Sequence, residues 1–289
     1  MVARLLIDLA PDPPAMTSIH AARAFRFKSM HERPRAFVIA NAWDAGAARM
    51  LAGLGFDAIG TSSGASAGTL GRRDGQVSRK EALAQARAIV DSVELPVSAD
   101  LEKGFADAPE DVAITIRLAA EAGLAGCSIE DASGDRDRPL FDLGLATERI
   151  AAAAEAAHAL PHPFVLTARS ENFLAGNPDL DDTIRRLQAY EKAGADVLFA
   201  PGLPHLDAIR TVCASLTRPV NFMVGIKGQS FTVATLEGVG VRRISLATSL
   251  YRAAMTGLLQ AAREVHEHGT FSYVDRSMTT AELNGFMRR

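Results

Sequence analysis

A short module that recurs along the chain constrains the fold more than any other feature of the sequence. In each copy a helical pattern ends at a glycine, a run of β-branched or apolar residues follows, and polar residues close the unit. Four copies are plain: LAGLGFDAIGTSS, AAEAGLAGCSIED, YEKAGADVLFAPG and LEGVGVRRISLAT. Their glycines, Gly55, Gly123, Gly194 and Gly240, suit the left-handed position just past a helix C-terminus. The apolar runs are too short for helices and too uniformly apolar for half-solvated strands, which predicts buried parallel strands.

The same pattern predicts eight strands along the chain, near 36–40, 57–61, 96–100, 125–130, 164–169, 196–200, 219–224 and 242–246. Each is followed by a helical pattern with a start signal: Asp44 and Thr248 as caps, the SRKE capping box at 78–81, and Pro109 and Pro204 in first turns. Eight alternating units in roughly 230 residues predict an α/β fold of the (β/α)8 TIM-barrel type. An open, doubly wound sheet is the alternative, although the first unit lacks a GxGxxG loop.

The organisation of the chain is that of a single domain, because no linker or composition break divides it. We expect the barrel to occupy 31–267. An N-terminal extension and lead-in helix would precede it over 1–30. A C-terminal segment over 268–289 would pack on the barrel or on a neighbouring subunit.

Composition excludes several classes of partner. The 289 residues are 48% hydrophobic and carry a formal charge of −3, which gives no reason to expect nucleic acid or a membrane surface. No apolar stretch reaches the length of a membrane span, and the N-terminus lacks the features of a signal peptide. Cys127 and Cys213 lie in apolar segments without CxxC spacing, as inert core residues of a reducing compartment do. These features predict a cytoplasmic globular protein.

Polar residues follow the predicted strands at their C-terminal ends, where barrels of this type hold their chemistry. They are Asn41, Trp43, Asp44, Thr61, Ser62, Ser63, Gly64, Asp74, Ser98, Asp100, Glu102, Lys103, Glu130, Asp131, Arg169, Glu171, Asn172 and Asn221. Carboxylates from three segments would meet at one rim and raise one another's pKa values. A hard divalent cation such as Mg²⁺ relieves that repulsion, and the lack of His and Cys among them argues against zinc.

Each of these candidates also has a purely structural interpretation. Asp131 is better explained as a helix cap or as a partner of Arg136 and Arg138, whereas Asp100 and Glu130 each end an apolar strand directly. Arg169 could grip a substrate carboxylate with two parallel hydrogen bonds, or form a salt bridge to Glu130 or Glu171. The small residues of TSSGA could bring backbone N–H groups close to an anionic oxygen.

Five segments occur in an order that resembles the isocitrate lyase/phosphoenolpyruvate mutase superfamily: FDAIGTSSGASAGTLGRRDG, LPVSADLEKGF, AGCSIEDAS, VLTARSENF and YEKAGADVLFAPG. The resemblance extends over about residues 20–285 and includes the closing SMTTAELNGF. It implies an (α/β)8 barrel whose eighth helix is swapped between subunits of a homodimer or homotetramer. It also implies Mg²⁺ and substrates that are 2-oxo acids or yield them, with C–C or P–C bonds made or broken.

The resemblance further implies roles for individual residues. Ser62 and Ser63 match the segment whose amides hold the enolate or oxo oxygen, and Trp43 lies where the first strand reaches the pocket. Arg169 matches the carboxylate-binding arginine. The resemblance also implies metal-site roles for Asp74, Asp100 and Glu130. Together with the strand-end pattern, this makes Asp74, Asp100, Glu102 and Glu130 the candidate metal-site residues and Glu130 and Arg169 the candidate catalytic residues, and Gly64 and Asn221 complete the candidate substrate-binding set.

Two departures from the family pattern bear on activity. The usual DAD metal motif reads SAD here, so that Ser98 stands in place of the customary first metal ligand. Glu102 could compensate by serving as a ligand itself. After the ED pair the chain reads ASGDRDRPLFDL, without the KKCGH-type loop of the isocitrate and methylisocitrate lyases or the Lys and Asn of the phosphonate enzymes. The sequence therefore resembles a branch lacking that loop, related to carboxyvinyl-carboxyphosphonate phosphorylmutase and 2-methylisocitrate lyase.

The function that we predict is a Mg²⁺-dependent lyase that makes or breaks a C–C bond of a small 2-oxo or 2-hydroxy dicarboxylate through an enolate. A P–C bond mutase or hydrolase of the same superfamily is one alternative. A Schiff-base aldolase using Lys227 and a non-catalytic 2-oxo acid binder are the others.

Overall fold

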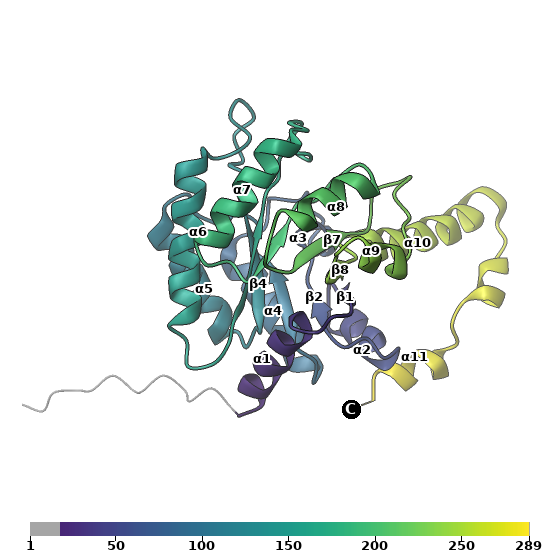
Figure 1. Ribbon diagram of the computed structural model, residues 1–289. Helices are drawn as coiled ribbons and strands as arrows, with labels where there is room; N and C mark the ends of the chain where they lie inside the picture. Colours follow the sequence, from purple (N-terminus) through teal and green to yellow (C-terminus); the bar gives the residue numbers. More distant parts are fainter. Residues whose placement is uncertain (1–17, 289) are drawn as a thin grey trace, which may run out of the picture.

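Eight parallel strands close into a barrel in the computed structural model, which describes residues 18–288 (Figure 1). In order around the barrel they are β1 (Phe37–Asn41), β2 (Ile59–Gly60), β3 (Val97–Asp100), β4 (Gly126–Glu130), β5 (Val165–Arg169), β6 (Val197–Phe199), β7 (Val220–Met223) and β8 (Arg243–Ser245). The sheet closes where β8 pairs with β1, with Arg243 opposite Phe37. Every strand overlaps its predicted range, so the predicted (β/α)8 barrel is confirmed and the open-sheet alternative is wrong.

Helices alternate with the strands and form the outer layer (Figure 1). The helix α1 (Ser18–His31) leads into the barrel. The others are α2 (Ala45–Gly53), α3 (Ser63–Thr69), α4 (Arg79–Ser92), α5 (Pro109–Glu121), α6 (Leu143–His158), α7 (Leu180–Lys192), α8 (Leu206–Ala214), α9 (Val233–Gly238), α10 (Ser249–His268) and α11 (Thr280–Phe286), with a 3₁₀ turn η1 at Ser272–Arg276. Because all strands run the same way, their C-terminal ends share one rim.

Most predicted helix starts are confirmed. The Asp44 side chain accepts a hydrogen bond from the Ala47 amide at 2.7 Å, and the capping box at Ser78 is complete. Pro109 is the first residue of α5. The prediction for Pro204 is wrong, because His205 caps α8 and the helix begins at Leu206.

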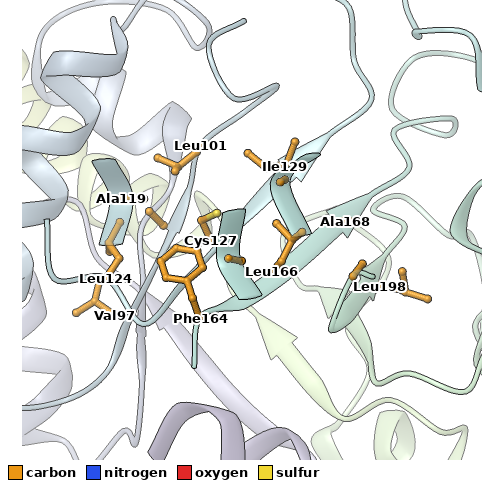
Figure 2. Packing of buried hydrophobic residues seen from close by; sticks show 14 of the residues in the cluster. Val97, Leu101, Ala119, Leu124, Cys127, Ile129, Phe164, Leu166, Ala168 and Leu198 are labelled. Carbon is orange, nitrogen blue, oxygen red and sulfur yellow. The ribbon is translucent and has the colours of Figure 1, made fainter. Parts of the chain in front are cut away.

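Apolar side chains fill the space between the barrel and its helices (Figure 2). Cys127 is fully buried among them, and burial raises the pKa of its thiol, as expected of an inert core residue. Gly126, the residue before it, has a packing requirement: an added Cβ would lie 2.4 Å from the Val165 carbonyl oxygen. The four module glycines all have positive φ, between 80° and 106°, which confirms the predicted turns into the strands.

The helix α10 differs from the other long helices because none of its 20 residues is buried (Figure 1). It extends away from the barrel, and the chain then returns through α11, where the Met287 carbonyl accepts a hydrogen bond from Arg49 at 2.8 Å. Within residues 18–288 no helix combines the length and apolar character needed to cross a membrane. The predicted N-terminal extension lies mostly outside the described residues.

Candidate active site

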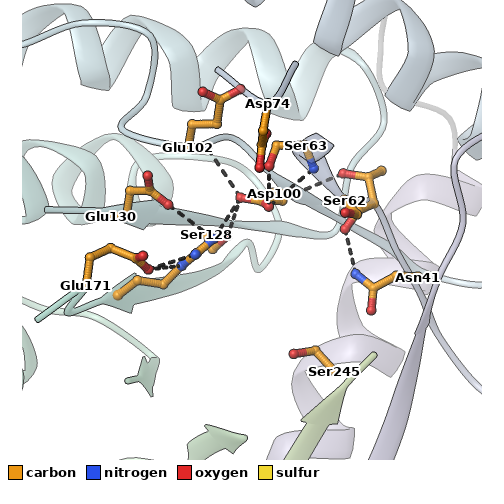
Figure 3. A network of polar contacts seen from close by, with 12 residues as sticks. Asn41, Ser62, Ser63, Asp74, Asp100, Glu102, Ser128, Glu130, Glu171 and Ser245 are labelled. Atoms are coloured by element: carbon orange, nitrogen blue, oxygen red, sulfur yellow. Dashed lines mark hydrogen bonds and ion pairs between the residues drawn. The ribbon is translucent and has the colours of Figure 1, made fainter. Parts of the chain in front are cut away.

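A small cavity opens at the rim formed by the C-terminal strand ends, where the polar network of Figure 3 lies. Its volume is about 210 Å³, below the ~300–1,000 Å³ of pockets for drug-sized molecules. Predicted site residues that line it are Ser62, Ser63, Asp74, Asp100, Arg169 and Asn221. The location and size suit a small polar metabolite.

Asp100 is the centre of the network, and both of its carboxylate oxygens are engaged (Figure 3). One oxygen accepts bonds from the amide and hydroxyl of Ser63 at 3.3 and 3.1 Å. The other accepts from Arg169 Nη1 at 3.0 Å, from the Glu102 amide at 3.3 Å and from the Ser128 hydroxyl at 3.4 Å. The last residue of β3 is therefore held in one orientation by groups from three other segments of the chain and by an amide of its own loop.

Arg169 binds three carboxylates at once. Its Nη1 lies 3.0 Å from Asp100 and 3.2 Å from Glu130, and its Nη2 lies 2.7 Å from Glu171. The guanidinium also stacks 5.1 Å from the centre of the Phe199 ring. The salt bridges expected as an alternative role of Arg169 are thus present, and they bring Asp100 and Glu130 to the same nitrogen atom.

The charges around Arg169 determine its protonation and that of its partners. Burial opposes the cation, but the three carboxylates raise the pKa of Arg169 above its ordinary value. Burial also raises the pKa values of Glu130 and Glu171, even though Arg169 acts in the opposite direction. Arg169 therefore stays cationic, and the acids crowded around it hold protons more tightly than exposed acids do.

Two more acids lie near Asp100: Asp74 lines the cavity, and Glu102 stands beside the cavity without lining it (Figure 3). Burial, followed by the charges of Asp100 and Asp74, raises the pKa of Glu102 to about 7. Glu102 also adopts a left-handed backbone with φ of 50°, which is unusual for a residue with a side chain and is often found at functional sites. Asp74, Asp100 and Glu102 are thus a cluster of acids whose repulsion a bound cation would relieve.

Oxygen ligands of this kind suit a hard cation such as Mg²⁺. Within residues 18–288, however, no three His, Cys, Asp or Glu side chains are grouped closely enough to hold a metal ion on their own. Of the four predicted metal-site residues, Asp100 and Glu130 are bonded to Arg169. The residues fit a largely hydrated Mg²⁺ near Asp74, Asp100 and Glu102 rather than a preassembled shell of four protein ligands, because Mg²⁺ usually keeps several waters.

The segment after β2 has a different arrangement from the one expected. The Ser63 amide, a predicted oxyanion donor, donates to Asp100. The Ser62 hydroxyl lies 3.0 Å from the hydroxyl of Thr248, which has the predicted N-cap position of α10 but makes no capping bond. An added Cβ at Gly64 would lie 3.1 Å from an Asp74 carboxylate oxygen, so the glycine allows Asp74 to approach this turn.

Of two other predicted substrate-binding residues, Asn221 lines the cavity and Trp43 does not. Trp43 does not line the cavity; its ring packs edge-on against Tyr251 with 5.3 Å between the ring centres. Asn221 lines the cavity, donates to the Ser245 hydroxyl at 3.0 Å and accepts from Arg243 Nε at 2.8 Å. Arg243 also lines the cavity, although it is not a strand-end residue: it begins β8, two residues before the strand ends at Ser245, so its position after a strand could not reveal it.

Asp131, the second acid of the ED pair, has a structural role as predicted, but the predicted partners Arg136 and Arg138 are wrong. Asp131 is 2% exposed and accepts bonds from Arg186 at 3.2 Å and from the Tyr190 hydroxyl at 2.6 Å, both from α7. It does not pair with Arg136 or Arg138; the latter lies 3.8 Å from Asp135 in the exposed loop. A pairing across distant helices replaces the local pairing that the sequence suggested.

The positions of Lys103 and Lys227 do not support a Schiff-base mechanism at the cavity. Lys103 donates to Asp107 at 2.6 Å and to the Ser133 carbonyl at 2.7 Å, and Lys227 is exposed. Neither lysine lines the cavity. The Schiff-base alternative therefore lacks a placed amine within the described part of the chain.

Comparisons with known proteins agree with this architecture. The family model described as phosphoenolpyruvate phosphomutase matches residues 27–266. A crystal structure of a candidate lyase/mutase from Burkholderia cenocepacia J2315 is 46% identical, with a TM-score of 0.93 over 94% of this chain and 98% of that chain. An uncharacterized protein of Mycobacterium tuberculosis is 31% identical over 89% of this chain and 94% of its own length. The 2-methylisocitrate lyase of Escherichia coli K12 is 29% identical over 92% of each chain. The chain therefore belongs to the phosphoenolpyruvate phosphomutase family of enzymes, within the isocitrate lyase/phosphoenolpyruvate mutase superfamily.

Proposed function

We propose that the protein is a lyase that cleaves a C–C bond of a small 2-oxo or 2-hydroxy dicarboxylate through an enolate. One observation carries the proposal: a cavity of about 210 Å³ places Arg169 and Asp100 side by side at the barrel rim. Relatives named 2,3-dimethylmalate lyase and oxaloacetate decarboxylase, each 28% identical, support the reaction class. Cleavage of dimethylmalate or methylisocitrate would release pyruvate directly and leave the enolate on the other acid product, whereas decarboxylation of oxaloacetate would leave the enolate of pyruvate.

Arg169 binds a substrate carboxylate in this proposal. Its guanidinium already meets three carboxylates, so that a substrate carboxylate replaces one of them without leaving the cation unpaired. A planar guanidinium can form two parallel bonds to such a group. Glu130, whose pKa burial raises, is the group that we assign to proton transfer.

Asp100, Asp74 and Glu102 would hold Mg²⁺, with Glu130 beside them, and the ion would supply positive charge for the developing enolate oxygen. The hydroxyl of Ser63, bonded to Asp100, keeps that carboxylate fixed. Ser62 and Asn221 would contact the substrate from two other sides of the cavity, which both of them line.

Turnover of the three acids tests the proposal directly, because each would release pyruvate. Pyruvate release from the dicarboxylates oxaloacetate and 2,3-dimethylmalate, and from the tricarboxylate 2-methylisocitrate as a larger comparison, is measured with Mg²⁺ and after chelation. We expect turnover of at least one acid and its loss after chelation; equal rates in both conditions would remove the cation from the proposal. No pyruvate from any of the three would contradict these substrates.

A substitution of Arg169 tests the assigned role. Two charge-assisted hydrogen bonds contribute about 1.5–3 kcal/mol each, so Arg169→Met should lower kcat/KM on the order of 10²–10⁴-fold. Arg210→Met on α8 is the matched control, because Arg210 is exposed and its ion pair, with Asp207, lies away from the cavity lining. Comparable losses in both variants would argue against the role of Arg169.

A second candidate function follows from the description of the matched family. A phosphoenolpyruvate phosphomutase rearranges a P–C bond, and the same Arg169 and acid cluster could hold a phosphonate and its carboxylate. Phosphorus NMR of phosphonopyruvate and phosphoenolpyruvate incubated with the protein distinguishes this reaction from C–C cleavage.

We propose further that two copies assemble through α10. This helix has no buried residue, and Leu258 and Leu259 are 63% and 50% exposed. Such an apolar surface on a projecting helix suits burial against a second copy, as a helix swapped between subunits provides. We expect the protein to sediment as a dimer or larger, and Leu258→Glu with Leu259→Glu to sediment as a monomer. Leu54→Glu, at a leucine 66% exposed at the end of α2, should leave the assembly intact because it lies outside α10.

A further inference from the structure

Arg243 is a buried cation that the proposed reaction does not use. It lies on β8, is 5% exposed and lines the cavity below the rim. Its Nε donates to the Asn221 side-chain oxygen at 2.8 Å. Of the guanidinium atoms, Nη1 is buried and has no hydrogen-bond partner within residues 18–288. The side chain therefore has donor capacity that no described group of the protein uses.

The charge of Arg243 is also uncompensated. The ion pairs at the cavity involve Arg169, and none of those formed by residues 18–288 includes Arg243. Burial, followed by the charge of Arg169, lowers the pKa of Arg243 to about 9. A buried guanidinium without a counter-ion is strongly unfavourable, so Arg243 is expected to have an anionic partner in the functional protein.

The surroundings of Arg243 leave room for such a partner. Ser98 and Ser128 line the same cavity and add hydroxyl groups. Ser98 stands where the family motif has an aspartate, so this position supplies a neutral donor in place of a carboxylate that could have paired with a cation. The interior thus combines an unpaired guanidinium, small polar side chains and open volume.

From this arrangement we propose that Arg243 forms a second anion-binding subsite at the floor of the cavity, which binds the distal carboxylate of a dianionic substrate while Arg169 binds the proximal one. This inference rests on the proposed function for the identity of the ligand as a small organic acid. It deepens that function, because it specifies that the substrate carries two acidic groups held by two separate arginines that line one cavity of about 210 Å³.

A matched pair of acids tests the subsite. Malate and 2-hydroxybutyrate differ in that the terminal carboxylate of malate is a methyl group in 2-hydroxybutyrate. Isothermal titration calorimetry of the full-length protein gives the two dissociation constants and their ratio. We expect malate to bind at least tenfold more tightly than 2-hydroxybutyrate, since a charge-assisted bidentate contact is lost with the methyl group.

The variants are Arg243→Met and the control Arg242→Met. Met fills a similar length without charge, and Arg242 is the adjacent arginine, half-buried, bonded to the Val241 carbonyl and absent from the cavity lining. In Arg243→Met the preference for malate should fall to within about twofold, with binding of 2-hydroxybutyrate changed less than threefold. Thermal unfolding checks the fold: removal of an uncompensated buried charge should leave the melting temperature equal or higher.

The outcomes separate this inference from the proposed function. A malate preference that persists in Arg243→Met, or no preference in the unmodified protein, overturns the subsite even if pyruvate-releasing turnover is present. A preference that depends on Arg243, together with no turnover of the three candidate acids, supports the subsite and overturns only the lyase reaction. Equal loss of preference in Arg242→Met would also count against Arg243.

Discussion

Replacing Asp131 by alanine removes the acceptor at the centre of a buried network that joins β4 to α7. The carboxylate accepts three hydrogen bonds: from the Glu171 amide at 2.8 Å, from Arg186 Nη1 at 3.2 Å and from the Tyr190 hydroxyl at 2.6 Å. The three donor residues are buried, so the substitution would leave their donors without this acceptor. Breaking a buried ion pair by removing one partner typically costs about 3–5 kcal/mol, because the remaining charge is left uncompensated.

The structure places the expected cost near the lower end of that range. Arg186 keeps two other acceptors, the Asp182 carboxylate at 2.9 Å and the Phe141 carbonyl at 2.9 Å. We therefore expect a loss of about 3 kcal/mol. With an unfolding entropy of about 2.1 cal/mol/K per residue, a chain of 289 residues would lose about 5 °C in melting temperature.

Urea unfolding at neutral pH, followed by circular dichroism, measures this loss as a shift of the midpoint at constant slope. Tyr190→Phe is the matched comparison, because it removes one of the three bonds and leaves the ion pair in place; we expect it to cost about 1.5 kcal/mol. A cost below about 1 kcal/mol for Asp131→Ala, or one no greater than that of Tyr190→Phe, would refute the reasoning.

Three further predictions concern pH, metal binding and packing. Burial lowers the pKa of His31 to about 3, so the unfolded chain takes up a proton first as the pH falls. Stability should therefore drop by about 2 kcal/mol from about pH 7 to about pH 5, and His31→Gln should flatten this loss in thermal unfolding. Because Glu102 has a pKa raised to about 7, Mg²⁺ should displace a proton and bind more tightly as the pH rises through that value. Calorimetry in two buffers would detect the released proton, and Glu102→Gln should lose it. Gly126→Ala should cost at least about 2 kcal/mol in urea unfolding, because the new Cβ would lie 2.4 Å from the Val165 carbonyl oxygen. Gly238→Ala in α9, which meets open space, should be neutral or stabilising; equal losses in both would contradict the packing argument.

The barrel and most of its helix starts could be predicted from the sequence because they depend on patterns a few residues long. Gly194 and Gly240 mark turns that need positive φ, and the run after each glycine is a buried strand. The capping box at Ser78 likewise involves atoms three residues apart. The parallel order then brings all strand ends to one rim, so the meeting of Asp100, Glu130 and Arg169 also followed from the pattern.

The partners of individual side chains depended on the tertiary structure alone. Asp131 pairs with residues 55 and 59 positions away on α7, and the Thr248 hydroxyl meets Ser62 from 186 positions away. Trp43 follows a strand end yet packs against Tyr251 outside the cavity lining. Arg243 looks, in the sequence, like one half of an arginine pair. Only closure of the barrel turns it inward beside Asn221, where it forms no ion pair with a carboxylate of residues 18–288, because the face that a strand residue presents is set by register with the neighbouring strands.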